Sequence, residues 1–161
     1  MEDVTQGAKP VSPPLGMHDL KLDDRQRLKL PATWVNFFNS LAEKSLFVTS
    51  LDDRIARIYP ISVWVANQEL LDTFTENPDA AETVTFTAQD NGATVEMDAQ
   101  GRITFPPKLR EKLKIEGQEL HLYGYRGHAE VMTDEVYKET KGATSAAKQQ
   151  AALTMKKAGL K

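Results

Sequence analysis

Apolar and polar residues alternate along two short stretches of the chain. In the first stretch the apolar positions are Leu20, Leu22, Leu28 and Leu30. In the second they are Val95, Met97, Ile103 and Phe105. Alternation with a period of two is typical of strands that bury one face. The pattern therefore predicts two short strands in each stretch, separated by polar turns at residues 23–26 and 98–101.

The two stretches are copies of one unit, because they align without a gap at one constant offset. The matching pairs are Asp23 with Asp98, Arg27 with Arg102, and Pro31 with Pro106. We predict a first repeat at residues 16–76 and a second at residues 77–140. A repeat of this length is too small to bury a good core alone, so we expect the two copies to pack on each other and form one pseudo-twofold domain.

Further elements follow each turn in the same order. The pattern predicts short helices at residues 32–40 and 107–113, and hairpins at residues 45–59 and 119–133. Helices at residues 62–74 and 134–140 come next, with Trp64 and Tyr137 packing beneath the sheets. Residues 1–15 and 141–161 have few apolar positions, and we expect them to be a flexible extension and a flexible tail.

The two turns differ at one position that matters for the backbone. Gly101 can take the positive φ that such a turn often requires. Gln26 stands at the equivalent place in the first repeat. We therefore expect the first turn to be strained or to have a different shape.

Composition limits the class of protein. Of the 161 residues, 40% are hydrophobic and 27% are charged, which is close to the average for globular domains. The chain has no cysteine, which excludes disulfides and thiolate chemistry. No stretch approaches the roughly 18 apolar residues of a membrane-spanning helix, and the N-terminus lacks the apolar run of a secretory signal. We expect a soluble cytoplasmic protein with no membrane partner.

An enzyme is not indicated. The three histidines are His18, His121 and His128. They have no metal-ligand spacing, and the sequence contains no nucleophile motif, phosphate loop or dinucleotide fingerprint. We expect no catalytic residue, cofactor, metal or small-molecule substrate, and we interpret His121 as a structural or surface histidine.

Charge is unevenly distributed along the chain. The formal net charge is −3 and the pI about 5.6, which alone argues against an anionic partner. Between Ile58 and Gly101, however, there is no Lys or Arg, and all the charges are acidic. The rest of the chain is therefore net positive. A basic face can coexist with an acidic one, because charges screen each other beyond about 8 Å at physiological salt.

Basic residues gather around the first turn and recur at the second. They are Lys21, Arg25, Arg27 and Lys29 in the first repeat and Arg102 in the second. Alternation places Lys21, Arg27 and Lys29 on the strand face opposite the leucines. Such cations can follow phosphates, and an arginine can bind guanine through two hydrogen bonds. We interpret these residues as candidate contacts to double-stranded DNA, with solvated surface charge as the alternative for Lys21, Arg25 and Lys29.

Asp23 and Asp98 need another explanation, since a carboxylate at a DNA surface costs electrostatic energy. We expect each to accept hydrogen bonds from the N–H groups of its turn, or to orient its partner arginine. The alternative is that the Asp-x-x-x-Arg pattern only ties the turn together.

The paired motif resembles the MraZ family. The resemblance lies in residues 22–31 and, more closely, in residues 95–111, where Val95-Glu-Met-Asp-Ala-Gln-Gly-Arg-Ile-Thr-Phe-Pro-Pro107 follows the family pattern. It implies an α+β, mostly β fold, an AbrB-like double-psi or swapped-hairpin barrel built from the two repeats. It also implies a transcription regulator that binds short direct repeats upstream of its own cell-division and cell-wall operon. Ring-shaped homo-oligomers and a place at the nucleoid follow from the same resemblance.

The resemblance also bears on the site, because in that family the Asp-x-x-x-Arg of each motif lies at the DNA-contacting surface. Carried over, this assigns Asp23 and Arg27, and Asp98 and Arg102. The sequence departs from the family at Gln26, where the pattern has glycine, and at residues 78–92, which lack a basic helix.

Two other functions remain open. An AbrB-like antitoxin would share the fold and bind DNA, although such proteins resemble one motif with a toxin-binding tail. The second alternative is an interaction scaffold with weak or no DNA binding, which the overall acidity favours. Co-purification of a small toxin and retardation of DNA at low salt would distinguish these from a regulator.

Overall fold

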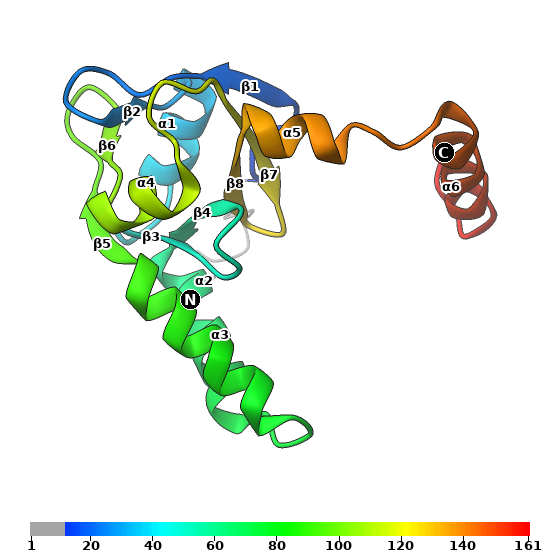
Figure 1. Ribbon diagram of the computed structural model, residues 1–161, viewed down its shortest axis with the longest axis horizontal. Helices are drawn as coiled ribbons and strands as arrows, with labels where there is room; N and C mark the ends of the chain where they lie inside the picture. Colours follow the sequence, from blue (N-terminus) through cyan, green and yellow to red (C-terminus); the bar gives the residue numbers. More distant parts are fainter. Residues whose placement is uncertain (1–11) are drawn as a thin grey trace, which may run out of the picture.

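The computed structural model describes residues 12–161, so most of the expected N-terminal extension lies outside the described residues. The stretch predicted as the first repeat contains β1 (Met17–Leu20), β2 (Arg27–Lys29), α1 (Ala32–Asn39), β3 (Ser45–Ser50), β4 (Ala56–Pro60) and α2 (Ile61–Thr73) (Figure 1). The stretch predicted as the second contains α3 (Pro78–Asn91), β5 (Ala93–Glu96), β6 (Arg102–Thr104), α4 (Pro107–Leu113), β7 (Leu120–Tyr125), β8 (His128–Thr133) and α5 (Asp134–Thr140). The predicted helices and hairpins agree with these bounds to within a residue or so.

The two repeats exchange strands. The larger sheet has six strands in the order β1-β7-β8-β4-β3-β5, all paired antiparallel. The first strand of each repeat therefore pairs with the hairpin of the other: β1 with β7, and β5 with β3. The two hairpins meet at β4 and β8, where Arg57 lies opposite Glu130. Each repeat thus takes a strand from the other to extend its part of the sheet.

The predicted barrel is the part of the fold that the structure corrects. The fold is α+β with mostly antiparallel strands, but within residues 12–161 the strands close no barrel. The strands β1 and β5 are the free edges of the larger sheet, and β2 and β6 form a separate two-stranded sheet. A single bridge between Leu22 and Leu28 links the two strands of the first stretch. The chain thus leaves the large sheet at each turn instead of continuing the ladder.

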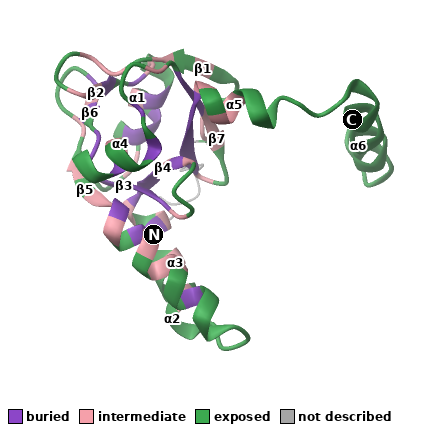
Figure 2. Ribbon diagram, viewed as in Figure 1, coloured by how far each residue is buried: buried purple, intermediate pink, exposed green. Residues whose placement is uncertain are grey.

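Two apolar clusters lie on opposite faces of the six-stranded sheet. The larger includes Leu28 and Ile103 from the small sheet and Trp34 from α1, each fully buried. The smaller contains Phe47, Tyr59, Trp64 and Ala88, and lies beneath α2 and α3. Trp64 packs on Phe47 with ring centroids 4.8 Å apart, as its predicted position beneath the sheet requires. Figure 2 shows the buried residues concentrated in the sheet and in the inner sides of the short helices.

Two helices were not expected from the sequence. At residues 78–92 no helix was anticipated, but α3 forms there, capped by Asn77, whose Oδ1 accepts from the N–H of Ala80 at 3.1 Å. The expected flexible tail contains α6 (Ser145–Lys157), capped in the same way by Thr144. Every residue of α6 is exposed. None of the helices in the described chain combines the length and apolar character that a bilayer crossing requires.

Candidate nucleic-acid interface

The first turn is organised by the carboxylate of Asp23. Its Oδ1 accepts hydrogen bonds from the backbone N–H groups of Arg25 and Arg27, both at 2.9 Å. Its Oδ2 accepts from Nε of Arg27 at 2.8 Å. One carboxylate therefore closes the turn and fixes the direction of the Arg27 side chain.

The second turn repeats this arrangement. Oδ1 of Asp98 accepts from the N–H groups of Gln100 and Arg102 at 2.9 Å, and Oδ2 accepts from Nε of Arg102 at 2.9 Å. Both of the roles expected for the aspartates are thus present in each turn. The Asp-x-x-x-Arg pattern ties the turn and orients the arginine at the same time.

The two turns also share one backbone shape. Gln26 has φ of 63° and Gly101 has φ of 78°, so both are left-handed. In each turn this residue donates its N–H to the carbonyl of the aspartate, at 2.9 and 3.0 Å. The first turn therefore keeps the shape of the second and carries the strain expected of a non-glycine residue in this conformation.

The small sheet brings the two arginines together. The strands β2 and β6 pair antiparallel, with Arg27 opposite Thr104 and Lys29 opposite Arg102. Leu28 and Ile103 are opposite each other and fully buried, so the charged residues lie on the outer face. The side chains of Arg27 and Arg102 are 24% and 26% exposed. The ribbon thus consists of one strand from each repeat, a partnership that sequence reasoning missed.

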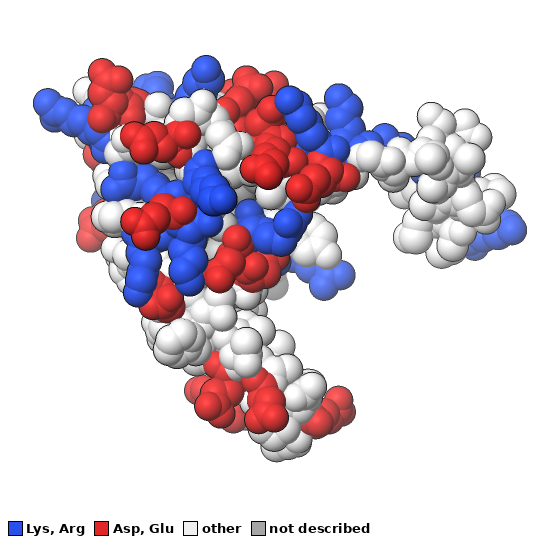
Figure 3. Space-filling view, in the orientation of Figure 1, with Lys and Arg blue, Asp and Glu red and all other residues white. Residues whose placement is uncertain are grey.

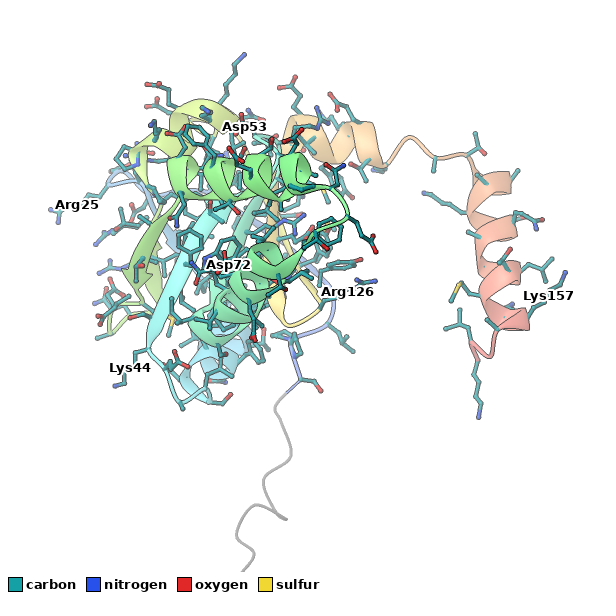
Figure 4. All side chains as sticks on the ribbon, turned by 90° about the horizontal axis from the view of Figure 1, so that it is seen from below. Arg25, Lys44, Asp53, Asp72, Arg126 and Lys157 are labelled. Carbon is teal, nitrogen blue, oxygen red and sulfur yellow. The ribbon has the colours of Figure 1, made fainter. Side chains whose placement is uncertain are left out.

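The remaining candidates lie at different distances from this ribbon. Lys29 is exposed on β2, and its Nζ is 3.4 Å from the carbonyl oxygen of Gln100 in the other turn. Arg25 stands at the tip of the first turn and projects away from the body (Figure 4). Lys21 is exposed but lies between β1 and the turn, outside any strand. The structure therefore brings together Arg27, Lys29 and Arg102, with Arg25 at one end.

The aspartates are held in their charged form. Hydrogen bonds from the Arg27 backbone N–H lower the pKa of Asp23, with further contributions from Arg25 and the Arg27 side chain that outweigh partial burial. The backbone N–H of Arg102 does the same for the pKa of Asp98. Both turns therefore keep their ion pair throughout the neutral range.

Two basic residues of α4, Lys108 and Lys112, have acidic partners. Nζ of Lys108 forms an ion pair with Asp90 at the end of α3, and Lys112 lies 3.4 Å from Asp90 and 3.5 Å from Asp53. In Figure 3 acidic and basic side chains alternate over this part of the surface. The positive charges of Lys108 and Lys112 are therefore largely neutralised. Only the packing of α3 beside α4 reveals this.

Among the described residues, one group of carboxylates and histidine has spacing that could hold a metal. The ligand atoms of Glu119, His121 and Asp134 lie within 4.8 Å of one another. His121 is buried, and its two ring nitrogens already contact Asp19 at 2.8 Å and Asp134 at 2.9 Å. Its ring also stacks on Tyr137 with centroids 3.9 Å apart. These contacts link β1 to β7 and α5, which is the structural role expected for this histidine.

The chain is similar to known proteins of one family. Residues 90–156 match the family described as "MraZ protein, putative antitoxin-like". The chain is 32% identical over 124 residues to the transcriptional regulator MraZ of Acidobacterium capsulatum, covering 77% of this chain and 84% of the relative. It is 32% identical over 104 residues to that of Koribacter versatilis, covering 64% and 71%. The corresponding values for Caldanaerobacter subterraneus subsp. tengcongensis are 28% over 130 residues, 81% and 87%. The chain belongs to the MraZ family.

Proposed function

We propose that this protein is a sequence-specific DNA-binding transcriptional regulator, a role that is not enzymatic. The observation that carries the proposal is the ribbon of β2 and β6, which presents Arg27 and Arg102 diagonally across one outer face, each from one of two matching turns. A two-stranded ribbon fits the major groove of DNA, where arginine reads guanine. The name of the relatives, transcriptional regulator MraZ, supports the same role.

The aspartates make this arrangement suitable for recognition. An arginine held at Nε by a carboxylate keeps its terminal Nη groups available and loses little side-chain freedom on binding. Lys29 and Arg25 add charge beside the two arginines and suit contacts to phosphates. In this proposal Arg27 and Arg102 read base edges, Asp23 and Asp98 orient them, and Lys29, Arg25 and Lys21 contact the backbone.

The finer points of the proposal rest on the family resemblance. We assign the strand exchange to the AbrB-like swapped-hairpin plan. The target is the promoter of the protein's own cell-division and cell-wall operon, bound at short direct repeats by a ring-shaped homo-oligomer at the nucleoid. Several weak sites on one assembly would raise avidity without new contacts, which compensates for the few cations that each subunit presents.

The test is binding of the full-length protein to DNA from upstream of its own operon, measured by fluorescence anisotropy against salt. We expect log affinity to fall linearly with log salt. Arg27→Ala/Arg102→Ala should weaken binding to this sequence by about 1–3 kcal/mol for each guanine that an arginine no longer binds. Arg25→Ala/Lys29→Ala, at positions proposed to contact phosphates, should make the slope shallower by about 2 for each subunit engaged, since each phosphate that is no longer neutralised removes about 0.9. Arg126→Ala/Lys114→Ala removes equal charge from exposed positions outside the ribbon, Arg126 lying in the turn between β7 and β8 on a different side of the body from Arg25 (Figure 4), and should leave the slope unchanged.

Two results would contradict the proposed function. A protein that binds this DNA no better than a scrambled sequence at low salt, or whose double arginine variant binds normally, is not a regulator acting through the ribbon. The first result would favour an interaction scaffold.

The description of the family as antitoxin-like favours a second candidate, an antitoxin. Its exposed helix α6 would then be the toxin-binding segment. A small toxin that co-purifies with the wild-type protein, and is absent when residues 141–161 are removed, would support this function.

A further inference from the structure

The helices α2 and α3 lie side by side and form an acidic hairpin, residues 61–91, that projects from the body (Figure 1). Its exposed carboxylates around the tip are Glu69, Asp72, Glu76, Asp79 and Glu82. No Lys or Arg occurs between Ile58 and Gly101 to neutralise them. Figure 3 shows acidic side chains, without basic ones, at the end of this hairpin.

The acidic hairpin also exposes large apolar side chains. Phe86 on α3 is 71% exposed and Leu70 on α2 is 61% exposed. A groove between the two helices is lined by Leu71, Phe74, Ala81 and Phe86, with Glu82 at its side. Apolar groups rimmed by charge are typical of protein-binding surfaces, whereas isolated apolar residues are not. The acidic hairpin therefore has the composition of an unoccupied interface.

The C-terminal helix α6 has the complementary composition. From Lys141 to Lys161 the chain carries lysines and no acidic residue. All of α6 is exposed, including Leu153 at 46% and Met155 at 53%. A 13-residue helix of this kind gains little from burial in the position shown, and isolated helices of this length are marginally stable in water. The helix thus exposes the apolar side chains of Leu153 and Met155 with no partner to cover them.

We propose that α6 of one copy of this chain docks on the acidic hairpin of a second copy. Opposite charge draws the two surfaces together, and their exposed apolar side chains provide area to bury. Like charge disfavours pairing of two acidic hairpins or of two α6 helices. The inference rests on the self-assembly proposed above and assigns a surface to it.

A second copy is favoured over the same chain by the way the segments project. In Figure 1 α6 and the acidic hairpin leave the body in different directions. The connection between α5 and α6 is residues 141–144, which spans at most roughly 14 Å when fully extended. Because the donor and acceptor surfaces differ, repeated contacts give a reciprocal pair or a ring when they close, and an open filament when they do not.

The test uses paired charge reversals in the full-length protein, with assembly followed by sedimentation velocity. Lys156→Glu/Lys157→Glu on the tail and Glu69→Lys/Glu82→Lys on the acidic hairpin should each raise the concentration for half-assembly about tenfold or more. The matched controls are Lys44→Glu/Lys114→Glu and Glu43→Lys/Glu116→Lys, which reverse equal charge elsewhere and should assemble as the wild type does. Circular dichroism confirms that each variant is folded.

Mixing the two reversed proteins is the decisive step. A glutamate-bearing tail meets a lysine-bearing hairpin, and the native tail of the other protein meets a native hairpin, so the mixture should assemble although neither protein does alone. The four-fold variant that carries both reversals should also assemble. Docking within one chain would restore nothing on mixing and would overturn the proposal.

The absence of cysteine allows a second readout. Leu153→Cys and Phe86→Cys proteins, mixed and mildly oxidised, should yield a cross-linked heterodimer, whereas Leu153→Cys mixed with Glu43→Cys should not. A monomeric wild type would refute self-assembly itself. A wild-type oligomer that is indifferent to both reversals would leave self-assembly standing and refute this surface, and reversals on the tail that weaken only DNA binding would also refute it.

Discussion

Gln26 and Gly101 occupy equivalent turns, and each offers its carbonyl to the other repeat. The N–H of Leu30 donates to the Gly101 oxygen at 2.9 Å, and the N–H of Phe105 donates to the Gln26 oxygen at 3.3 Å. Both residues are left-handed, with φ of 63° for Gln26 and 78° for Gly101. The turns thus determine how the arginines point and also join the two repeats.

Gln26→Gly should stabilise the protein. A residue with a Cβ in the left-handed conformation lowers the free energy of unfolding by about 1–2 kcal/mol. Glycine avoids this strain but loses about 0.5–1 kcal/mol because its unfolded backbone is more flexible, so the net gain in stability is about 1 kcal/mol. Thermal unfolding should shift upward by about 2–4 °C. The opposite change, Gly101→Ala, should destabilise, since its Cβ would lie 2.6 Å from Cγ2 of Val35. Equal unfolding midpoints for the wild type and Gln26→Gly would show that the turn is not strained.

Leu28→Ala should destabilise by about 2–5 kcal/mol, because the side chain is fully buried opposite Ile103 where the repeats meet. Lys29→Gln is the control on the same strand, and it should change the unfolding free energy by no more than about 0.5 kcal/mol. Urea unfolding followed by tryptophan fluorescence measures both. Similar destabilisation of the two variants would contradict the burial of Leu28.

Stability should depend on the protonation of His121. Burial lowers the pKa of this histidine, but hydrogen bonds to Asp134 and Asp19 outweigh burial and raise it above the usual 6.5. Because the folded-state pKa is raised, the stabilisation that protonated His121 provides is fully present below about pH 6.5 and is lost as pH rises through the folded-state pKa. The contribution of His121 to the urea midpoint of the protein should therefore fall as pH rises from about 6 to about 9.

His121→Gln supplies the comparison for this prediction, because it cannot gain a proton. Its midpoint should change less over the same interval, and Asp19→Asn should reduce the dependence in part. A wild type that gains stability relative to His121→Gln as pH rises would contradict the assignment.

Under the proposed function, Arg27→Lys/Arg102→Lys tests the geometry of the two guanidinium groups at constant charge. Lysine keeps the positive charge but cannot form the planar, two-bonded contact with guanine. Specific affinity should fall by about 1–3 kcal/mol for each guanine that an arginine no longer binds, whereas affinity for scrambled DNA and the salt slope should stay nearly constant. Competition anisotropy with specific and scrambled duplexes measures the ratio. A drop in both affinities by the same factor would indicate contacts to phosphates only.

Local elements were predictable because their causes are local. Alternation around residues 20–30 and 95–105 indicated the strands, and prolines at 31 and 106 marked the following helices. The helix α3 was missed because Thr83, Thr85 and Thr87 are β-branched and weak helix formers. Its cap, Asn77 followed by Pro78, was the available signal.

Which elements pair with one another could not be predicted from the sequence. The repeat indicated that the halves pack together, but nothing local shows that β1 joins β7 or that β2 joins β6. Arg27 and Arg102 were correctly chosen as outward-facing residues, yet their proximity follows only from that exchange. The pairing of Lys108 with Asp90 likewise depends on where α3 packs.

The ribbon of β2 and β6 has a further consequence, because its two halves are similar but not identical. The first turn carries Asp24 and Arg25 where the second has Ala99 and Gln100, and Lys29 on β2 corresponds to Thr104 on β6. A true twofold dimer looks the same from either end and suits palindromes. This ribbon has a head and a tail, so a subunit bound through it would have one preferred polarity along an asymmetric duplex.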